Sequence, residues 1–287
     1  MKTALTLSAT LVSALALAGA AQAQDVKIEN AVARVIVLVE DRADVAVEVE
    51  RGRADLPVPT VRQRGDRIEV DGNLPRRAIR SCRSGRLGAS MPGEGASVEV
   101  RGTGRVDLSD APLIIVHTPR DVDLGVQGAV FGTIGRGATN VDFGNGGCGD
   151  WTIANVDENL DLSLGGSGDA LVGTSGRLEI AIGGSGDVRA GATRDLEIAI
   201  GGSGDIEVAR VDGPVELNVA GSGDLLVRGG TAPRMDISVA GSGDVEFRGT
   251  VGDLSVSIAG SGDVRVDEVT GRVSRAVLGS GDISIGR

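Results

Sequence analysis

A single tetrapeptide, Gly-Ser-Gly-Asp, recurs through the second half of the chain at a nearly constant interval. It stands at 166–169, 184–187, 202–205, 221–224, 241–244, 260–263 and 279–282, and a variant with Cys148 in place of serine occupies 147–150. The steps between successive copies are 19, 18, 18, 19, 20, 19 and 19 residues. A fixed period of this length predicts a repeat architecture, in which each unit buries its apolar face against its neighbours.

Each repeat carries the pattern of two short strands and two turns. In the unit that starts at Leu178, the apolar side chains of Leu178, Ile180 and Ile182 alternate with Glu179 and Ala181. This period of two is typical of a strand with one buried face. The glycine-rich run 183–187 follows as a turn, and 188–190 alternates again before a second, variable turn.

The two turns of a unit differ in type, which favours a solenoid over an antiparallel meander. One turn is always Gly-Ser-Gly-Asp, whereas the other varies in sequence. The pattern therefore predicts an all-β fold, a right-handed parallel β-solenoid of about 19-residue coils, with equivalent strands stacked about 4.8 Å apart. The chain has no Tyr, one Trp and three Phe, so we expect a narrow interior filled by aliphatic side chains, with little room for rings.

The polar residues of the repeated turn are predicted to be structural. We expect each carboxylate to accept N–H groups of its own turn, the glycines to supply unusual backbone angles, and the serine hydroxyls to form a parallel ladder. The residues concerned are Ser167, Ser185, Ser203, Ser222, Ser242, Ser261 and Ser280, with Asp150, Asp169, Asp187, Asp205, Asp224, Asp244, Asp263 and Asp282.

Calcium between adjacent turns is the alternative interpretation of the same aspartates. The candidate ligands would be Asp169, Asp187, Asp205, Asp224, Asp244 and Asp263. The stretch Gly-Gly-Ser-Gly-Asp is similar to the calcium-binding repeat Gly-Gly-x-Gly-x-Asp, but it lacks the spacer before the aspartate. We therefore predict no metal and no cofactor.

The two cysteines, Cys82 and Cys148, are predicted to form a disulfide, because an even pair in an exported protein is usually bridged. Two free thiols, or a metal site shared with His117, are the alternatives. His117 is expected to be a surface residue at a strand end. No Gly-x-Ser-x-Gly elbow supports a Ser-His-Asp triad.

Three segments are expected along the chain. Residues 1–23 have the charged start, short apolar run and Ala21-Gln22-Ala23 cleavage site of a secretory signal peptide. Residues 24–128 are predicted to form irregular coils and a cap, with a separate β-sandwich as the alternative, and 129–287 the regular coils. Within the irregular segment, 75–95 is expected to be a loop or excursion, and 102–106 a degraded copy of the repeated turn.

The acidic net charge limits the kinds of partner that the protein can bind. The chain has 29 Lys and Arg against 40 Asp and Glu, and removal of the signal segment leaves a net −12. This balance argues against nucleic acid and against an anionic membrane surface. No stretch after the signal is apolar enough to span a bilayer. Only 283–287 follow the last turn, so we expect this coil to leave an open edge that stacks on a partner or on another copy.

The tandem Gly-Ser-Gly-Asp units after a signal peptide resemble the bacterial auto-transporter adhesin head GIN domain family, most closely over 147–287. The resemblance implies a β-helical envelope domain with an adhesin or surface role, and it supplies no catalytic residues. We therefore expect an exported, non-enzymatic interaction scaffold for an unidentified envelope protein or surface component. The periplasm is the expected location, with the cell surface or secretion as alternatives. The alternative functions are a polysaccharide-acting enzyme and a calcium-dependent repeat domain.

Overall fold

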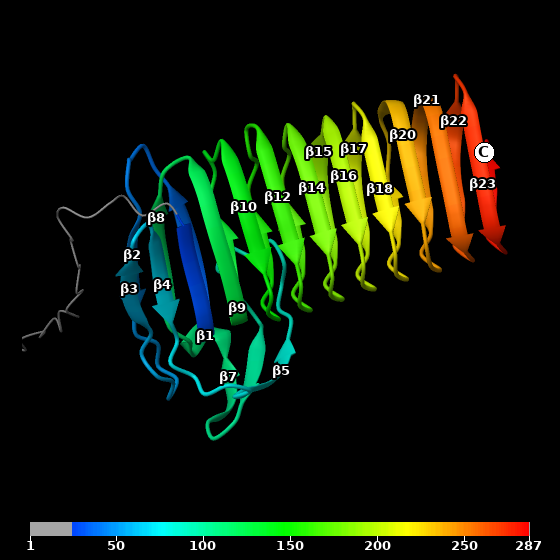
Figure 1. The fold of residues 1–287 in the computed structure, drawn as a ribbon. Helices are drawn as coiled ribbons and strands as arrows, with labels where there is room; N and C mark the ends of the chain where they lie inside the picture. Colours follow the sequence, from blue (N-terminus) through cyan, green and yellow to red (C-terminus); the bar gives the residue numbers. More distant parts are fainter. Residues whose placement is uncertain (1–24, 287) are drawn as a thin grey trace, which may run out of the picture.

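The computed structural model describes residues 25–286, so the predicted signal peptide lies outside the described residues. The chain forms an all-β parallel solenoid whose coils follow one another along a rod (Figure 1). Every strand pair between regular coils is parallel, for example β14 with β16 and β15 with β17. The parallel pairing confirms the predicted solenoid and excludes the meander.

Each coil contributes one strand to each of two faces, separated by the Gly-Ser-Gly-Asp turn. The strand before the turn lies on what we call the A face, and the strand after it on the B face. The A face contains the first halves of β1 (Asp25–Val39) and β9 (Asp121–Ile134), then β10 (Asn140–Asn145), β12 (Asn159–Leu164), β14 (Arg177–Ile182), β16 (Asp195–Ile200), β18 (Val215–Val219), β20 (Thr231–Val239), the second half of β21 (Val245–Gly260), and β23 (Val273–Gly279).

The B face continues the same coils after the turn. It contains the second halves of β1 and β9, then β11 (Trp151–Ile153), β13 (Ala170–Val172), β15 (Val188–Thr193), β17 (Ile206–Val211), β19 (Leu225–Val227), the first half of β21, β22 (Val264–Val269) and β24 (Ile283–Ile285).

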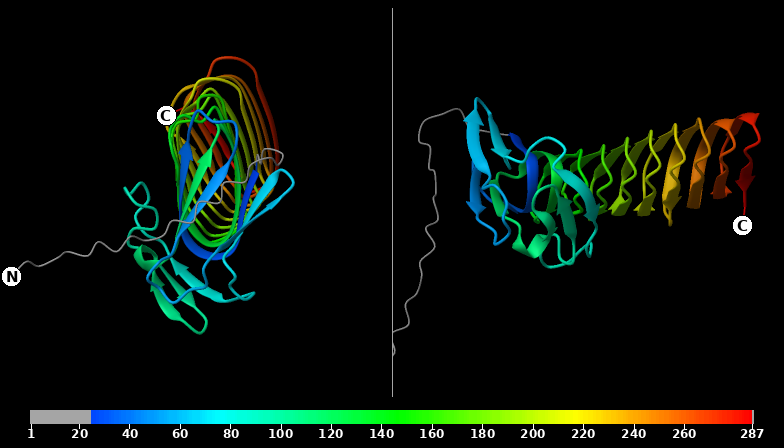
Figure 2. Two further views of the ribbon diagram at one scale, coloured as in Figure 1. Left: turned by 90° about the vertical axis from the view of Figure 1, so that its left-hand side faces the viewer. Right: turned by 90° about the horizontal axis from the view of Figure 1, so that it is seen from below.

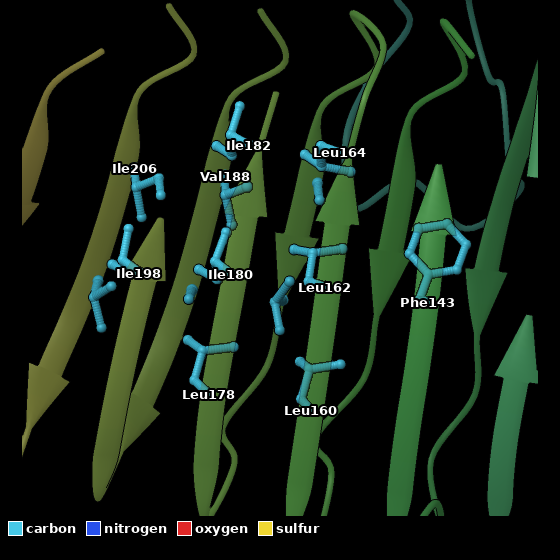
Figure 3. Close-up of a cluster of buried hydrophobic side chains, with 14 of the residues drawn as sticks. Phe143, Leu160, Leu162, Leu164, Leu178, Ile180, Ile182, Val188, Ile198 and Ile206 are labelled. Carbon is cyan, nitrogen blue, oxygen red and sulfur yellow. The ribbon is translucent and has the colours of Figure 1, made fainter. Parts of the chain in front are cut away.

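The core is built of columns of equivalent side chains. Leu160, Leu178 and Leu196 stack in register from coil to coil, and all three are buried. Figure 3 shows such aliphatic side chains pointing inward from the strands of successive coils. Burial of aliphatic side chains in every coil supplies the main favourable free energy of folding.

Rings do enter this interior, contrary to the expectation of an almost purely aliphatic filling. Phe143 and Trp151 are both buried, with ring centroids 4.5 Å apart, and Trp151 Nε1 donates a hydrogen bond of 2.8 Å to the Val130 carbonyl. A Cβ built on Gly132, one rung away from Trp151, would overlap the indole ring. Glycine in the neighbouring coil therefore creates the space that the ring occupies.

The glycines of the repeated turn are required by close stacking of backbones. A Cβ on Gly184 would overlap the carbonyl oxygen of Gly166 in the preceding coil, and a Cβ on Gly186 would overlap that of Gly168. Of the glycines in these turns, only Gly260 and Gly279 have positive φ. The prediction that turn glycines supply unusual backbone angles was therefore wrong for most turns, because the lack of a Cβ matters more than the dihedral angle.

The first coil is covered on its outer edge by strands from the segment between β1 and β9. The other edge of β1 pairs in parallel with β4 (Arg67–Asp71) and β8 (Leu113–Thr118). These strands in turn pair antiparallel with β3 (Thr60–Arg64) and β2 (Ala46–Glu50). Backbone groups that would otherwise be an open sheet edge are thereby paired.

A second small sheet protrudes from the side of the rod near its N-terminal end (Figure 2). It has the order β5 (Ile79–Arg83), β6 (Ser97–Val100), β7 (Gly104–Asp107), all antiparallel, and is followed by the 3₁₀ helix η1 (Leu108–Asp110). Its apolar face packs on Phe131, which points out of the solenoid into a separate core. We call residues 75–105, which contain this sheet, the excursion.

One local expectation is corrected by this sheet. Residues 102–106 do not form a solenoid turn, because 104–107 are strand β7 and pair antiparallel with β6. The segment 75–95, expected to be a loop or an excursion, belongs to the excursion and contains strand β5 at 79–83. Local sequence does not reveal this sheet, because its apolar side packs on Phe131, which lies outside the segment.

The two ends of the described chain differ. At the far end of the rod, β23 and β24 each pair on one side only among residues 25–286, and Leu278 on β23 is 79 % exposed. Within the same residues there is no helix with the length and hydropathy needed to cross a bilayer.

Candidate functional site

The repeated aspartates form a hydrogen-bonded row along one edge of the solenoid. Asp187 Oδ1 accepts a bond of 2.9 Å from the backbone N–H of Asp205, and Asp205 Oδ1 accepts one of 2.9 Å from Asp224 N–H. The same bond, at 2.8–3.2 Å, links every successive pair from Asp150 to Asp282. The donors therefore belong to the next coil, and the expectation of bonds within the turn was wrong.

This arrangement explains how like charges can stand in neighbouring coils. From Asp150 to Asp263, each carboxylate accepts an N–H group that points at it from the following coil, which offsets part of the repulsion between neighbouring carboxylates. The backbone carbonyl of the same aspartate accepts the N–H of an apolar residue in the preceding coil, as Asp205 does from Val188 at 2.8 Å. Each aspartate from Asp150 to Asp263 thus connects its coil to both neighbouring coils.

Removal of one carboxylate acceptor should show how much this hydrogen bond between coils contributes to stability. Asp205→Ala leaves the Asp224 N–H without its partner and is expected to lower the free energy of unfolding by about 1–2 kcal/mol. Asp205→Asn keeps an oxygen acceptor at the same place and should cost much less. Urea denaturation of both variants measures the difference, and equal losses would show that the hydrogen bond does not carry the effect.

The serines of the turn present their side chains to solvent. All seven are exposed, and within residues 25–286 none makes a side-chain hydrogen bond. Their backbone N–H groups instead bond to a glycine carbonyl of the preceding coil, as Ser185 does to Gly166 at 3.0 Å. The predicted ladder of hydroxyls is therefore not formed. In the described part of the chain, no three His, Cys, Asp or Glu side chains are grouped so that they could hold a metal ion.

The excursion is joined to the solenoid at the first turn of the aspartate row, residues 147–150. Cys148, which replaces the serine there, is bonded to Cys82 of β5, with Cα atoms 6.2 Å apart. Asp150, which is only 7 % exposed, accepts bonds from Ser84 Oγ at 3.2 Å and from the Gly85 N–H at 3.3 Å. Burial raises the pKa of the Asp150 carboxyl, and these donors oppose the shift.

His117 lies on β8 in the cap, away from the aspartate row. Its Nδ1 is 2.9 Å from Glu40 Oε1, and its Nε2 is 3.9 Å from Glu48 Oε1. The hydrogen bond from His117 lowers the pKa of Glu40. The histidine therefore joins the strand ends of the cap, and the structure does not bring it near Cys82 or Cys148.

A second acidic row, which the sequence reasoning missed, runs along the outside of the A face. Eight successive rungs place an acidic residue at the same register position, and we call this the A-face row. Its members are Asp25, Asp123, Asp142, Asp161, Glu179, Glu197, Glu216 and Asp236. From Asp123 onward each lies between two apolar residues, as in Leu178-Glu179-Ile180, and this apolar–acidic–apolar pattern is the signal that could have revealed it.

An open groove of about 790 Å³ lies over the first part of the A-face row. Ala43 and Pro119 from the cap overhang it on one side, and Asp123, Asp142 and Asp161 line its floor. Burial raises the pKa of Asp123 and of Asp161, and in both cases the neighbouring carboxylate of Asp142 adds to the shift. The groove thus concentrates negative charge that is less well hydrated than on an open surface.

Removal of the Asp142 charge should therefore lower the pKa of both Asp123 and Asp161. For Asp123 and Asp161 the folded pKa lies above the unfolded value of about 4, so ionisation destabilises the fold as pH rises through that window. Asp142→Asn is expected to lower both pKa values and to give a small gain in stability at pH 7 that vanishes below about pH 4. Other charges also contribute to these pKa values. Asp25 raises and Arg67 lowers the pKa of Asp123, and Glu179 raises and Arg177 lowers the pKa of Asp161.

Carboxyl-carbon chemical shifts followed against pH would measure both values directly. Asp195→Asn serves as the control, because it also removes one negative charge but Asp195 does not contribute to the pKa of Asp123 or of Asp161. Unchanged titration of Asp123 and Asp161 in the Asp142→Asn variant would contradict the assigned coupling.

Comparison with solved structures supports the fold. Two crystal structures of proteins from Parabacteroides distasonis share this fold. One is titled a putative lipid binding protein, with 16 % identity, a TM-score of 0.52 and 94 % of both chains covered. The other is titled a putative adhesin, with 14 % identity, a TM-score of 0.51, and 92 % of this chain and 93 % of the other covered. At such identities the likeness shows the fold alone.

No protein with a curated description matches the chain. The disulfide and the adhesin-family domain together indicate a location outside the cytoplasm. Residues 190–286, the C-terminal third of the chain, match the family model described as "Putative auto-transporter adhesin, head GIN domain", so this part of the solenoid is similar to that family.

Proposed function

We propose that the protein is an exported, non-catalytic scaffold of the cell envelope that binds a partner through the A-face row, and that it works in the periplasm. The observation that carries the proposal is the row itself: eight carboxylates in register, one per rung. At about 4.8 Å per rung the row spans more than about 30 Å. Asp25, Glu179, Glu197 and Asp236 pair with neighbouring arginines, whereas Asp123, Asp142, Asp161 and Glu216 make no ion pair within residues 25–286. Such a surface is complementary to an elongated partner that carries regularly spaced positive charge.

The row also extends well beyond the groove, and this favours a binding surface over a local reaction centre. Glu197, Glu216 and Asp236 continue the row on the open rod in the same register, with Arg177 paired to Glu197 and Arg234 paired to Asp236. Their side chains stand on a rigid base, since the strands beneath them are hydrogen-bonded on both sides and their inward residues are buried. Little conformational entropy would therefore be lost by the scaffold on binding.

The test is capture of envelope components by the mature protein and by a variant with the row neutralised. The variant is Asp142→Asn, Asp161→Asn, Glu179→Gln and Glu197→Gln. The control removes the same charge from exposed acids outside the row: Asp41→Asn, Glu50→Gln, Glu158→Gln and Glu268→Gln. We expect the row variant to lose what the wild type and the control both retain. Equal capture by all three proteins would overturn the proposal.

The groove favours a second candidate, a glycan-cleaving activity. Asp123 and Asp161 have raised pKa values, as a general acid requires, and Asp142 lies between them on the groove floor. The wild type would then release reducing ends from envelope polysaccharide, and Asp142→Asn would slow this by at least about 100-fold. Absence of release by the wild type would remove this candidate and leave the scaffold.

A further inference from the structure

The charge of this protein is strongly segregated, although the net value is negative. The excursion, residues 75–105, contains seven arginines and two glutamates, a net +5. Residues 121–287, which form the coils from β9 onward, contain 12 basic and 25 acidic residues, a net −13. A basic sheet therefore protrudes from the side of an acidic rod (Figure 2).

Five of these arginines lie on or beside the edge strand of the excursion. Arg76 and Arg77 lead into β5, Arg80 and Arg83 lie on it, and Arg101 follows β6. The backbone N–H of Arg101 bonds to the Ala78 carbonyl at 2.8 Å, which places it beside the start of β5. We call these five residues the arginine patch.

The members of the patch are exposed, and within residues 25–286 they make no ion pair. The two other arginines of the excursion are neutralised locally, Arg86 by Glu94 and Arg105 by Asp107, each at 3.4 Å. Arg77 also has a φ of 61°, a left-handed conformation that is unfavourable for a residue with a Cβ. The backbone conformation at Arg77 therefore carries some cost in free energy.

The base beneath the patch is rigid. Cys82, between Arg80 and Arg83 on β5, is bonded to Cys148 of the solenoid. The inward face of the sheet packs on the buried ring of Phe131. The backbone that carries the arginines is therefore held in place, which favours binding of several anionic groups at once.

We propose that the arginine patch docks the protein on an anionic membrane surface through lipid phosphate groups. Arginine binds phosphate oxygens through two parallel hydrogen bonds, and basic residues are attracted to an anionic leaflet. From Arg76 to Arg83 the chain can extend over up to about 20 Å, too far for one small anion but suited to several headgroups. The A-face row lies on the solenoid strands and not on the excursion, so the two surfaces do not share residues.

This inference revises the expectation drawn from the total charge. A net −12 argues against an anionic membrane only when the charge is spread evenly. Screening limits the repulsion from the distant coils, because at physiological salt exposed charges interact weakly beyond about 8 Å. The five arginines next to the lipid thus dominate the interaction.

The experiment is co-sedimentation of the mature protein with phosphatidylcholine vesicles that contain no anionic lipid, or about one third phosphatidylglycerol. The patch variant is Arg76→Gln, Arg77→Gln, Arg80→Gln, Arg83→Gln and Arg101→Gln. The control carries the same change of charge on exposed arginines of the rod: Arg136→Gln, Arg189→Gln, Arg194→Gln, Arg265→Gln and Arg275→Gln. Circular dichroism and melting confirm that each variant is folded.

We expect the wild type and the control to bind only the anionic vesicles, and the patch variant to bind at least about tenfold more weakly. High salt should release the wild type. Equal binding by the patch variant and the control, or no binding by the wild type, would overturn the proposal. Binding of soluble inorganic polyphosphate without any binding to vesicles would also overturn it, since the arginines would then bind a free anion. So would loss of self-association as the only effect of the patch variant, since the arginines would then bind a second copy.

Discussion

Alanine in place of Gly184 is expected to lower the free energy of unfolding by about 3 kcal/mol. A Cβ there would overlap the carbonyl oxygen of Gly166 in the coil below, and backbone cannot move aside as a flexible side chain can. Every later coil is built on this contact, so separation of two coils would propagate along the rod. Urea denaturation followed by far-ultraviolet circular dichroism measures the loss.

The adjacent Gly183 is a matched control, because a Cβ built on it meets nothing within 4 Å. Gly183→Ala removes the same backbone freedom from the unfolded chain, and should leave stability unchanged or raise it by about 0.5 kcal/mol. Similar losses from the two variants would mean that the turn needs glycine for its dihedral angles and not for close stacking.

Loss of the disulfide should have the largest effect on the excursion. Cys82→Ser with Cys148→Ser opens a covalent loop of 66 residues and is expected to cost up to about 4 kcal/mol. The contacts of Asp150 with Ser84 and Gly85 remain, but they are weak by comparison. Hydrogen exchange should therefore become fast in β5, β6 and β7 while β16 and β18 stay protected.

Reduction gives an independent control for this prediction. A thiol reductant should produce the same exchange pattern in the wild type and should have no effect on the double serine variant. If protection of β5 to β7 survives reduction, the apolar contact with Phe131 alone would be sufficient to hold the excursion.

The solenoid could be predicted from sequence because its determinants are local and repeated. The alternation around Leu178, Ile180 and Ile182 and the recurring turn both lie within one unit. The partners of Asp205 and the neighbour of Gly184 could not be found in this way, since both belong to adjacent coils. Stacking geometry must be known before the role of either residue is visible.

The excursion, the A-face row and the arginine patch are harder to predict from sequence, for other reasons. Strand β5 depends on the outward ring of Phe131, which no local pattern connects to it. The A-face row could have been read from the acid between two apolar residues in each unit, as in Leu160-Asp161-Leu162. The total charge, in contrast, concealed the arginine patch, because an average over the chain does not report where the charges lie.

Distances between spin labels on the A-face row test the central claim, that equivalent residues stack one coil apart. Labels at position 142, paired in turn with 197, 216 and 236, are three, four and five rungs apart. The parallel solenoid predicts that the distance grows by about 4.8 Å with each rung. In an antiparallel meander each repeat would add two strands to the sheet, so increments of about 9.6 Å, or no regular increase, would contradict this account.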